Sequence, residues 1–341
     1  MRTAVATISD VARVAGVSIS TVSAALSGKR HVASDTRSRI EAVARTMGYH
    51  PNAGARMLAG TRAQMLALSA PLHADTSTPA HMRFVLAVTT AARAHGYDTL
   101  LLVEDEAAAG IERVSASALA DGIVVMDVDA RDRRADQLRS GRYPAVFLGV
   151  PDDPTGLRCV DLDFAAAARL CLDRLAGLGH RAVGLVGQPE VTYERGTNYA
   201  RVFRDAFVAH AAATGLRCEV VTPEPGRLGA DAALPRLRRL LPDVSAVVLN
   251  ASELTTHRFV RSCLEAGLRI PGDLSLVVAG ASFDTSDDDV PLDTVPLPAA
   301  TMGARAVQLL VDRIEGASEP VVERLAPTYV ERGSVAAPDA A

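Results

Sequence analysis

Residues that could perform chemistry are scattered along this sequence rather than gathered into motifs. The four cysteines stand at wide, irregular intervals, which fits neither a disulfide framework nor a zinc site. The eight histidines form no H-E-x-x-H pattern, and there is no glycine-rich dinucleotide motif, phosphate-binding loop or G-x-S-x-G elbow. We therefore expect no enzyme activity, no metal and no cofactor.

One acidic run, Asp284–Asp289, could suggest calcium. It lacks the ligand spacing, the central glycine and the terminal glutamate of a calcium loop. A solvated loop is the expected structure.

Charge divides the chain into two parts. Residues 1–62 carry a net charge of +6, which leaves −10 for the remainder. A basic head on an acidic body predicts a polyanionic partner for the head alone. The composition, 48% hydrophobic and 22% charged, is that of a globular protein. The chain shows no signal peptide and no apolar run of membrane-spanning length, so we expect a cytoplasmic protein with no membrane partner.

The elements of the head follow from apolar spacing. The first helix repeats apolar residues and stops at a glycine: Ile8, Val11, Ala12, Ala15 and Gly16. The second has a serine cap and an apolar stripe: Ser18, Val22, Ala25 and Leu26. A third helix is expected over about 34–47, with Ser34-Asp35-Thr36 as its cap. Two helices joined by a glycine turn form a helix-turn-helix, although the pattern alone also allows a bundle that binds nothing.

The segment after these helices runs from Tyr49 to Ala59. Pro51 stands where a helix could begin, and the helix that would follow is too short to be stable by itself. A helix that forms only when supported suits a hinge that orders on DNA and wedges into the minor groove. Together with the charge division, this segment favours DNA binding.

These motifs resemble the lactose-repressor/galactose-repressor family without a gap. The matching stretches are Thr7-Ile8-Ser9-Asp10-Val11-Ala12, Ala15-Gly16-Val17-Ser18, Thr21-Val22-Ser23 and Tyr49-x-Pro51-Asn52. The resemblance implies a helix-turn-helix domain (1–50), a hinge (51–62), and an effector-binding and dimerisation core (63–330). It also implies that the core has two periplasmic-binding-protein-like subdomains, 63–161 with 293–325 and 162–292 with 326–335. Residues 336–341 read as a loose tail.

The resemblance also implies residue roles in the head. Three residues fall where the family reads bases in the major groove: Ile19, Ser20 and Ala24. Others fall at backbone-contacting or positioning sites: Thr7, Ser18, Thr21, Ser23, Tyr49 and Asn52. Lys29 and Arg30 are expected on phosphates, and Ala55 and Leu58 in the minor groove. Ala24 departs from the family, whose members often carry a long polar side chain there, so the preferred operator could differ from familiar ones.

Downstream of Gln64, β-rich runs alternate with helical stretches. Strands are expected at 65–70, 97–103, 122–128, 145–150, 182–187, 218–222, 246–250 and 274–279. Helices are expected near 80–95, 131–140, 164–178, 197–213, 229–241, 253–266 and 299–315. This alternation predicts an α/β core of two doubly wound parallel sheets with a ligand cleft at their carboxyl edges. Asp163 is expected to cap a helix, and His180 to be a packing residue.

Among the effector positions implied by the family, Asp152 matches the aspartate of sugar-responsive members, and the others depart from the sugar-binding pattern. Seven residues fall at or near those positions: His81, Asp152, Tyr199, Ser252, Glu253, Ser282 and Asp284. The hydroxyl groups of a sugar would lose their water on entering such a cleft and find too few hydrogen-bond partners there. We therefore do not assign the effector to the sugars.

The function predicted is a ligand-responsive transcriptional regulator, more often a repressor in this family, that binds a pseudo-palindromic DNA operator as a homodimer. Two alternatives are a solute-binding receptor with no DNA role and an α/β enzyme with a regulatory head. The basic head argues against the first, and the missing catalytic motifs argue against the second.

Overall fold

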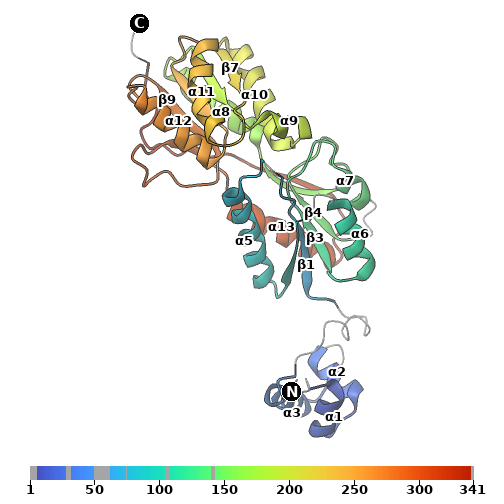
Figure 1. Ribbon diagram of the computed structural model, residues 1–341. Helices are drawn as coiled ribbons and strands as arrows, with labels where there is room; N and C mark the ends of the chain where they lie inside the picture. Colours follow the sequence, from blue (N-terminus) through green and yellow to red (C-terminus); the bar gives the residue numbers. More distant parts are fainter. Residues whose placement is uncertain are drawn as a thin grey trace. The chain divides into compact units, whose positions relative to one another are not determined.

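The chain divides into two compact units. The computed structural model describes residues 6–27, 32–49, 62–73, 75–103, 107–139 and 143–338. Within it, residues Met1–Gln64 and Met65–Ala341 form separate units (Figure 1). We call them the head and the body.

The head contains three described helices, α1 (Ile8–Ala15), α2 (Ile19–Ser27) and α3 (Ser34–Thr46). Thr7 and Asp10 form a capping box at the start of α1, and Gly16 ends it with the left-handed backbone (φ 66°) that glycine adopts without strain. Val11, Val22 and Ile40 are fully buried at the centre. The expected cap of α3 is wrong: Ser34 is already helical and Ala33 holds the N-cap position without a side-chain bond.

The first sheet of the body has six parallel strands in the order β11-β5-β4-β3-β1-β2. Their bounds are β1 (Met65–Ser69), β2 (Asp98–Leu102), β3 (Gly122–Val125), β4 (Ala145–Leu148), β5 (Arg158–Leu162) and β11 (Val321–Leu325). The helices around this sheet are α5 (Thr78–Ala94), α6 (Ala107–Ser117), α7 (Arg133–Leu138) and α13 (Ala299–Ile314). We call this layered structure the first subdomain.

The second subdomain is built on five parallel strands in the order β10-β9-β8-β6-β7. These are β6 (Ala182–Val186), β7 (Arg217–Val221), β8 (Ala246–Leu249), β9 (Ser275–Ala281) and β10 (Asp293–Pro296). Its helices are α8 (Phe164–Gly177), α9 (Glu190–Arg195), α10 (Asn198–Thr214), α11 (Arg227–Leu240) and α12 (Glu253–Glu265).

Helices cover both faces of each sheet. In the first subdomain α5 and α13 pack together on one face and α6 and α7 lie on the other; in the second, α8 pairs with α10 and α11 with α12 (Figure 1). Because both faces are covered, the central strands are apolar throughout: all four residues of β3 and of β8 are buried. The predicted fold class is confirmed.

The chain crosses between the subdomains after β5, after β10 and after β11. One expected boundary is therefore wrong, since residues 293–296 pair with β9 and lie in the second sheet. The expected tail is wrong in part: Ala336 exchanges hydrogen bonds with Ser275 and accepts one from the buried His180. Burial of His180 and the Asp163 cap on α8 follow the sequence prediction.

Candidate functional site

The outer face of α2 is the first candidate site. Val22 and Ala25 turn into the head's core, and the opposite side carries Ile19, which is 50% exposed, and the exposed Ser20. Ser18 accepts a hydrogen bond from the backbone N–H of Thr21 (3.1 Å) and so caps the helix. A helix with a fixed start and an exposed outer face has the form required to enter a DNA groove.

The other predicted DNA residues divide into three groups. Thr7, Ser18 and Thr21 make hydrogen bonds within the head that fix its helices. Tyr49 is buried in the head's core, while Ser23 and Ala24 are half-buried on α2. Lys29, Arg30, Asn52, Ala55 and Leu58 lie outside the described residues.

The second candidate site is a cleft between the two subdomains, with a cavity of about 180 Å³. It is lined by residues that follow β1, β3, β4 and β5 on one side and β6, β8 and β9 on the other. All are carboxyl ends of parallel strands, which is where open α/β sheets bind ligands.

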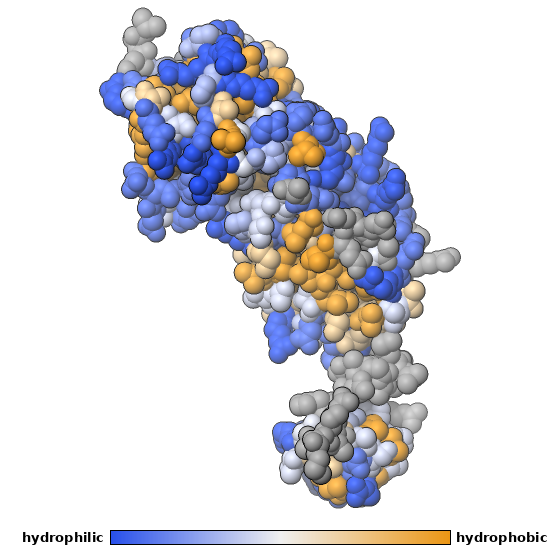
Figure 2. All heavy atoms as spheres, viewed as in Figure 1, coloured by the Kyte–Doolittle hydropathy of each residue, from blue (hydrophilic) through white to orange (hydrophobic). Residues whose placement is uncertain are grey.

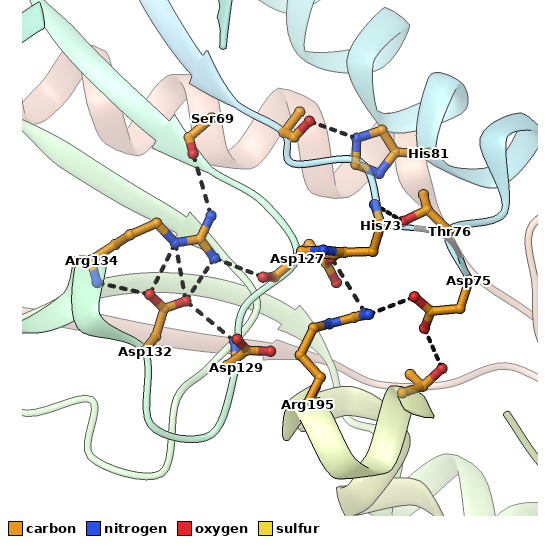
Figure 3. A network of polar contacts seen from close by, with 12 residues as sticks. Ser69, His73, Asp75, Thr76, His81, Asp127, Asp129, Asp132, Arg134 and Arg195 are labelled. Carbon is orange, nitrogen blue, oxygen red and sulfur yellow. Dashed lines mark hydrogen bonds and ion pairs between the residues drawn. The ribbon is translucent and has the colours of Figure 1, made fainter. Parts of the chain in front are cut away.

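An ion pair crosses this cleft. Arg195, at the end of α9, places Nη1 2.6 Å from Asp75 Oδ1 and Nη2 3.7 Å from Asp127 Oδ2 (Figure 3). Thr192 donates a hydrogen bond of 2.5 Å to the other oxygen of Asp75. Burial raises the pKa of Asp75, but the bonds from Thr192 and Arg195 outweigh it and hold that pKa below its usual value. Asp75 is therefore ionised and bonded to the opposite subdomain.

A buried pair behind the cleft positions Asp127. Arg134 and Asp132, whose side chains are only 7% and 4% exposed, bond through Nε and Nη2. Arg134 also donates to Ser69 Oγ (3.3 Å) and to the carbonyl of Asp127 (2.7 Å) (Figure 3). Asp127 has a φ of 53°, an uncommon conformation for a residue other than glycine. The Arg134 bonds stabilise that backbone.

Backbone contacts also join the two subdomains. The loop after β3 and the turn before α10 exchange hydrogen bonds, Ala130 N–H to Gly196 O (2.8 Å) and Asn198 N–H to Val128 O (3.0 Å). Asn198 Nδ2 donates to Val150 O. The cleft is closed by bonds that a more open form must break.

The cleft holds polar atoms without a protein partner. Asn250 Nδ2 donates to Ala279 O (3.0 Å), which fixes the amide, and its buried Oδ1 accepts nothing. The buried Nε of Arg195 donates to nothing. Phe164 and Tyr199 form an aromatic wall, with ring centroids 5.4 Å apart. A small molecule that can both donate and accept hydrogen bonds fits this lining.

Two ionisable groups in the cleft are shifted toward neutrality. Burial raises the pKa of Asp161 to about 7. Burial lowers the pKa of His81, whose Nε2 lies 3.3 Å from Ala70 O. The lining therefore combines charged groups near Arg195 with less charged ones elsewhere.

Four of the seven predicted effector residues line the cavity: His81, Tyr199, Ser252 and Ser282. The other three do not line it. Asp152 pairs with Arg201, Asp284 with Arg332, and Glu253 begins α12. The Oγ of Ser252 also caps α12, so part of its hydrogen-bonding capacity is already used.

Sequence reasoning missed the strongest polar groups of the cleft. Asp75, Asp127, Gln188 and Asn250 each stand a few residues beyond the carboxyl end of a strand, a position that could have marked them. Arg195, four residues before the predicted Tyr199, was not among the expected effector residues. The argument that a sugar would lack hydrogen-bond partners in the cleft therefore loses its basis, since residues at other positions supply polar groups.

The described residues offer neither a membrane-spanning helix nor a metal-binding cluster. Among them, no helix has both the length and the apolar character needed to cross a bilayer. No group of three or more potential ligand side chains there could hold a metal ion. All four cysteines are free, and Cys159, Cys171 and Cys263 are buried.

Comparison with known proteins identifies the family to which the chain is similar. Residues 7–52 match the model of bacterial regulatory proteins of the lacI family, and residues 172–335 match the periplasmic binding protein-like domain. The HTH-type transcriptional regulator CelR of Thermobifida fusca is 28% identical over 92% of this chain and 94% of its own. The lactose operon repressor of Escherichia coli K12 is 25% identical over 98% and 91%.

The fold agrees with solved structures as well. The Lac repressor dimer bound to operator and the anti-inducer ONPF has a TM-score of 0.82, with 22% identity over 97% of this chain and 99% of that one. With both domains matched in the order the sequence predicted, the chain belongs to the LacI family of bacterial regulatory proteins and is a DNA-binding transcriptional regulator.

Proposed function

We propose that this regulator binds a pseudo-palindromic operator as a homodimer, as a repressor, and that a small effector in the body's cleft controls its affinity. The observation that carries the proposal is the presence in one chain of an exposed recognition helix and a cleft with cross-cleft bonds and unpartnered polar atoms. A DNA partner means that it works in the cytoplasm. The reading as an enzyme gains no support, because the strongest charged groups of the cleft, Arg195 and Asp75, are bonded to each other across it.

On DNA, Ile19, Ser20 and Ala24 of α2 face base edges. Ile19 suits an apolar contact to a thymine methyl, and Ser20 suits a hydrogen bond to a base edge. Thr7, Ser18, Thr21 and Ser23 fix register on the backbone, with Tyr49 holding the head's core. The hinge residues Ala55 and Leu58, together with Lys29, Arg30 and Asn52, complete the interface by analogy with the family.

The dimer uses an apolar face of the first subdomain. Its members are exposed apolar side chains on the loop after β1, on α5 and along the edge strand β2: Leu72, Met82, Leu86, Leu101 and Val103. Leu86 is 59% exposed, and Figure 2 shows a broad hydrophobic area on this subdomain. A two-fold dimer places two heads on two half-sites, so a second copy of the chain is the occupant that function requires.

The effector occupies the cleft and presents hydroxyl groups. A hydroxyl can donate to Asn250 Oδ1 or to Asp127, and can accept from Arg195 Nε, while an apolar ring face packs on Phe164 and Tyr199. The cavity of about 180 Å³ suits a single ring more than an extended chain. Because these groups can bond hydroxyls, sugars and other polyols are candidate effectors.

Coupling follows from the bonds across the cleft. An effector that interacts differently with the closed and the open body shifts the equilibrium between them. The bonds of Arg195 with Asp75 and Asp127 are those that an effector replaces or strengthens. How the two copies of the first subdomain meet then sets DNA affinity.

The DNA part is tested by selecting binding sites with the full-length protein from random DNA and from its own upstream region. We expect a pseudo-palindrome with half-sites about one helical turn apart. We also expect two chains per site and an affinity that falls steeply with salt. Equal, weak binding to every fragment at moderate ionic strength contradicts the proposal.

The effector part is tested by thermal shift with a panel of polyols, sugars, amino acids and nucleosides. A true effector raises the melting temperature of the wild type. Asp127→Asn should reduce that rise, whereas Asp98→Asn, on an exposed carboxylate of the same subdomain, should retain it. An identical response in both variants contradicts a role for the cleft.

A further inference from the structure

A second cavity lies at the opposite edge of the first sheet from the cleft. Its volume is about 170 Å³, and its lining comes from the amino ends of β4, β5 and β11 and the carboxyl ends of α7 and α13. Three arginines line it, Arg139, Arg158 and Arg313, with Tyr143 and Ser318 beside them. We call it the Arg158 pocket.

Arg158 is buried without a partner. The residue is 6% exposed, yet its guanidinium makes no hydrogen bond or ion pair anywhere in the part of the chain that the structure describes. Arg134 is equally buried, at 6%, and has the carboxylate of Asp132. Guanidinium groups stay charged in proteins, and a largely buried charge without a counter-charge is unfavourable even where, as here, its nitrogens keep some contact with solvent.

The surroundings of Arg158 increase this cost. Burial and the like charge of Arg313 both lower the pKa of Arg158, and Asp312 and Glu319 only partly oppose them. Neither acid lines the pocket. An anion inside the pocket supplies what the protein does not.

The rest of the lining is held in place. Arg139 donates to Asp153 O (3.1 Å) and to Thr155 O, and Arg313 donates to Ala317 O (3.2 Å). The hydroxyl of Tyr143 donates to Ala120 O (2.8 Å). These bonds anchor the walls, while the guanidinium of Arg158 keeps all its donors available. The pocket is therefore a preformed cavity with fixed walls rather than a surface cluster of charges.

We propose that the Arg158 pocket binds a phosphate group, free or as the monoester of a small metabolite, as a second ligand site separate from the cleft. Phosphate fits because several guanidinium groups line one small cavity, and guanidinium donors match the oxygens of a phosphate. In the cleft, by contrast, Arg195 is already paired with Asp75 and Asp127, so the two sites should select different ligands.

The test is a titration of the full-length protein with orthophosphate, glycerol 3-phosphate and acetate, each against chloride at equal ionic strength. Calorimetry and thermal shift are the readouts. We expect saturable binding of at least one phosphate compound and a raised melting temperature. Tighter binding of the monoester identifies a metabolite as the ligand, and tighter binding of orthophosphate identifies the free ion.

Arg158→Met removes the charge and keeps an apolar stem. It should weaken phosphate binding on the order of tenfold to a hundredfold, since charge-assisted bonds are lost. Without phosphate it should melt no lower than the wild type, because the charge that is lost is largely buried and has no partner in the described chain. Arg239→Met, on an exposed arginine of α11, is the matched control and should keep the response.

A second variant guards against misfolding of the first. Ser318→Asp puts a carboxylate at the exposed rim of the pocket, where it should fold normally and compete with phosphate. Phosphate binding that survives in both Arg158→Met and Ser318→Asp overturns the proposal. So does a wild-type response to phosphate no larger than that to chloride, or binding of acetate as tight as that of phosphate.

Discussion

The head and the cleft prepare for their partners in opposite ways. On α2, Ile19 and Ser20 stand exposed over a packed core. In the cleft, Arg195 and Asp75 are largely buried and already bonded to each other across two subdomains. DNA that binds the head makes contacts with side chains that are already exposed. A ligand of the cleft must replace or reinforce existing bonds, so its binding energy is converted into movement.

The largest expected effect comes from breaking the head alone. Val22→Asp places a carboxylate in the fully buried centre of a small core and should cost about 3 kcal/mol or more, enough to unfold the head. Specific DNA binding should disappear while the body's melting transition stays in place. Calorimetry and fluorescence anisotropy on the selected operator measure both.

Val14→Asp is the matched control, because Val14 is 55% exposed on α1. Amide exchange should show its head still folded. If Val22→Asp binds the operator as tightly as the wild type, a folded head is not needed for specific DNA binding and the contrast between head and cleft fails.

The next effect comes from cutting the cross-cleft bond. Arg195→Met leaves Asp75, whose side chain is 4% exposed, without its counter-charge. We expect the body to lose about 2–4 kcal/mol of stability, or to open and hydrate the carboxylate. Denaturant unfolding measures the first outcome, and X-ray scattering measures the second as a larger radius of gyration.

Glu194→Ala, an exposed neighbour on α9, should change neither quantity. If Arg195→Met matches it in stability and in size, the ion pair does not hold the cleft closed.

A smaller effect concerns pH. Asp161 has a pKa raised to about 7 by burial, so the folded state keeps its proton while the unfolded chain has lost it. Stability should then fall as pH rises from about 4 to 7. Asp161→Asn should remove this slope and stabilise the body at pH 8 by roughly 1–3 kcal/mol. Thermal unfolding from pH 4 to 8 checks it, and parallel wild-type and variant curves refute it.

The smallest effect is on base reading. Ser20→Ala removes one hydroxyl from the exposed face of α2 and should cost about 1 kcal/mol per half-site. The preference at one operator position should relax, with non-specific affinity unchanged. Ser38→Ala on the exposed side of α3 is the control. Site selection with both variants shows whether the two preferences differ.

The sequence was informative where local rules decide the structure. Gly16, Ser18 and the spacing of Val11, Val22 and Ile40 predicted the head, because helix ends and apolar faces depend on near neighbours. Eight strands and seven helices of the body were expected close to their observed bounds.

Elements with weak local signals were missed. Strand β11 alternates half-buried and exposed residues at the sheet edge, and β5 carries Arg158 and Asp161 within an apolar run. Strand β10 is only four residues long, and its pairing with β9 depends on a chain crossing that periodicity does not reveal.

The cleft was predicted in kind but not in detail. Tyr199 and Ser282 lie in the lining, whereas Asp152 and Asp284 lie outside it and each pairs with an arginine that does not line the cavity. Effector binding by any of them stays a prediction. Arg195 meets Asp75 from 120 residues away in sequence, a distance over which no local pattern reports. Contacts of this kind required the structure.

The most direct test of the account is whether the cleft controls the head. Operator affinity of wild type, Arg195→Met and Glu194→Ala is measured by fluorescence anisotropy at one salt concentration, beside a non-specific duplex. We predict that Arg195→Met changes the operator dissociation constant by at least about fivefold, with Glu194→Ala and the non-specific duplex unaffected. Identical operator binding by an Arg195→Met protein whose cleft is shown by scattering to be open contradicts the claim that cleft closure sets DNA affinity.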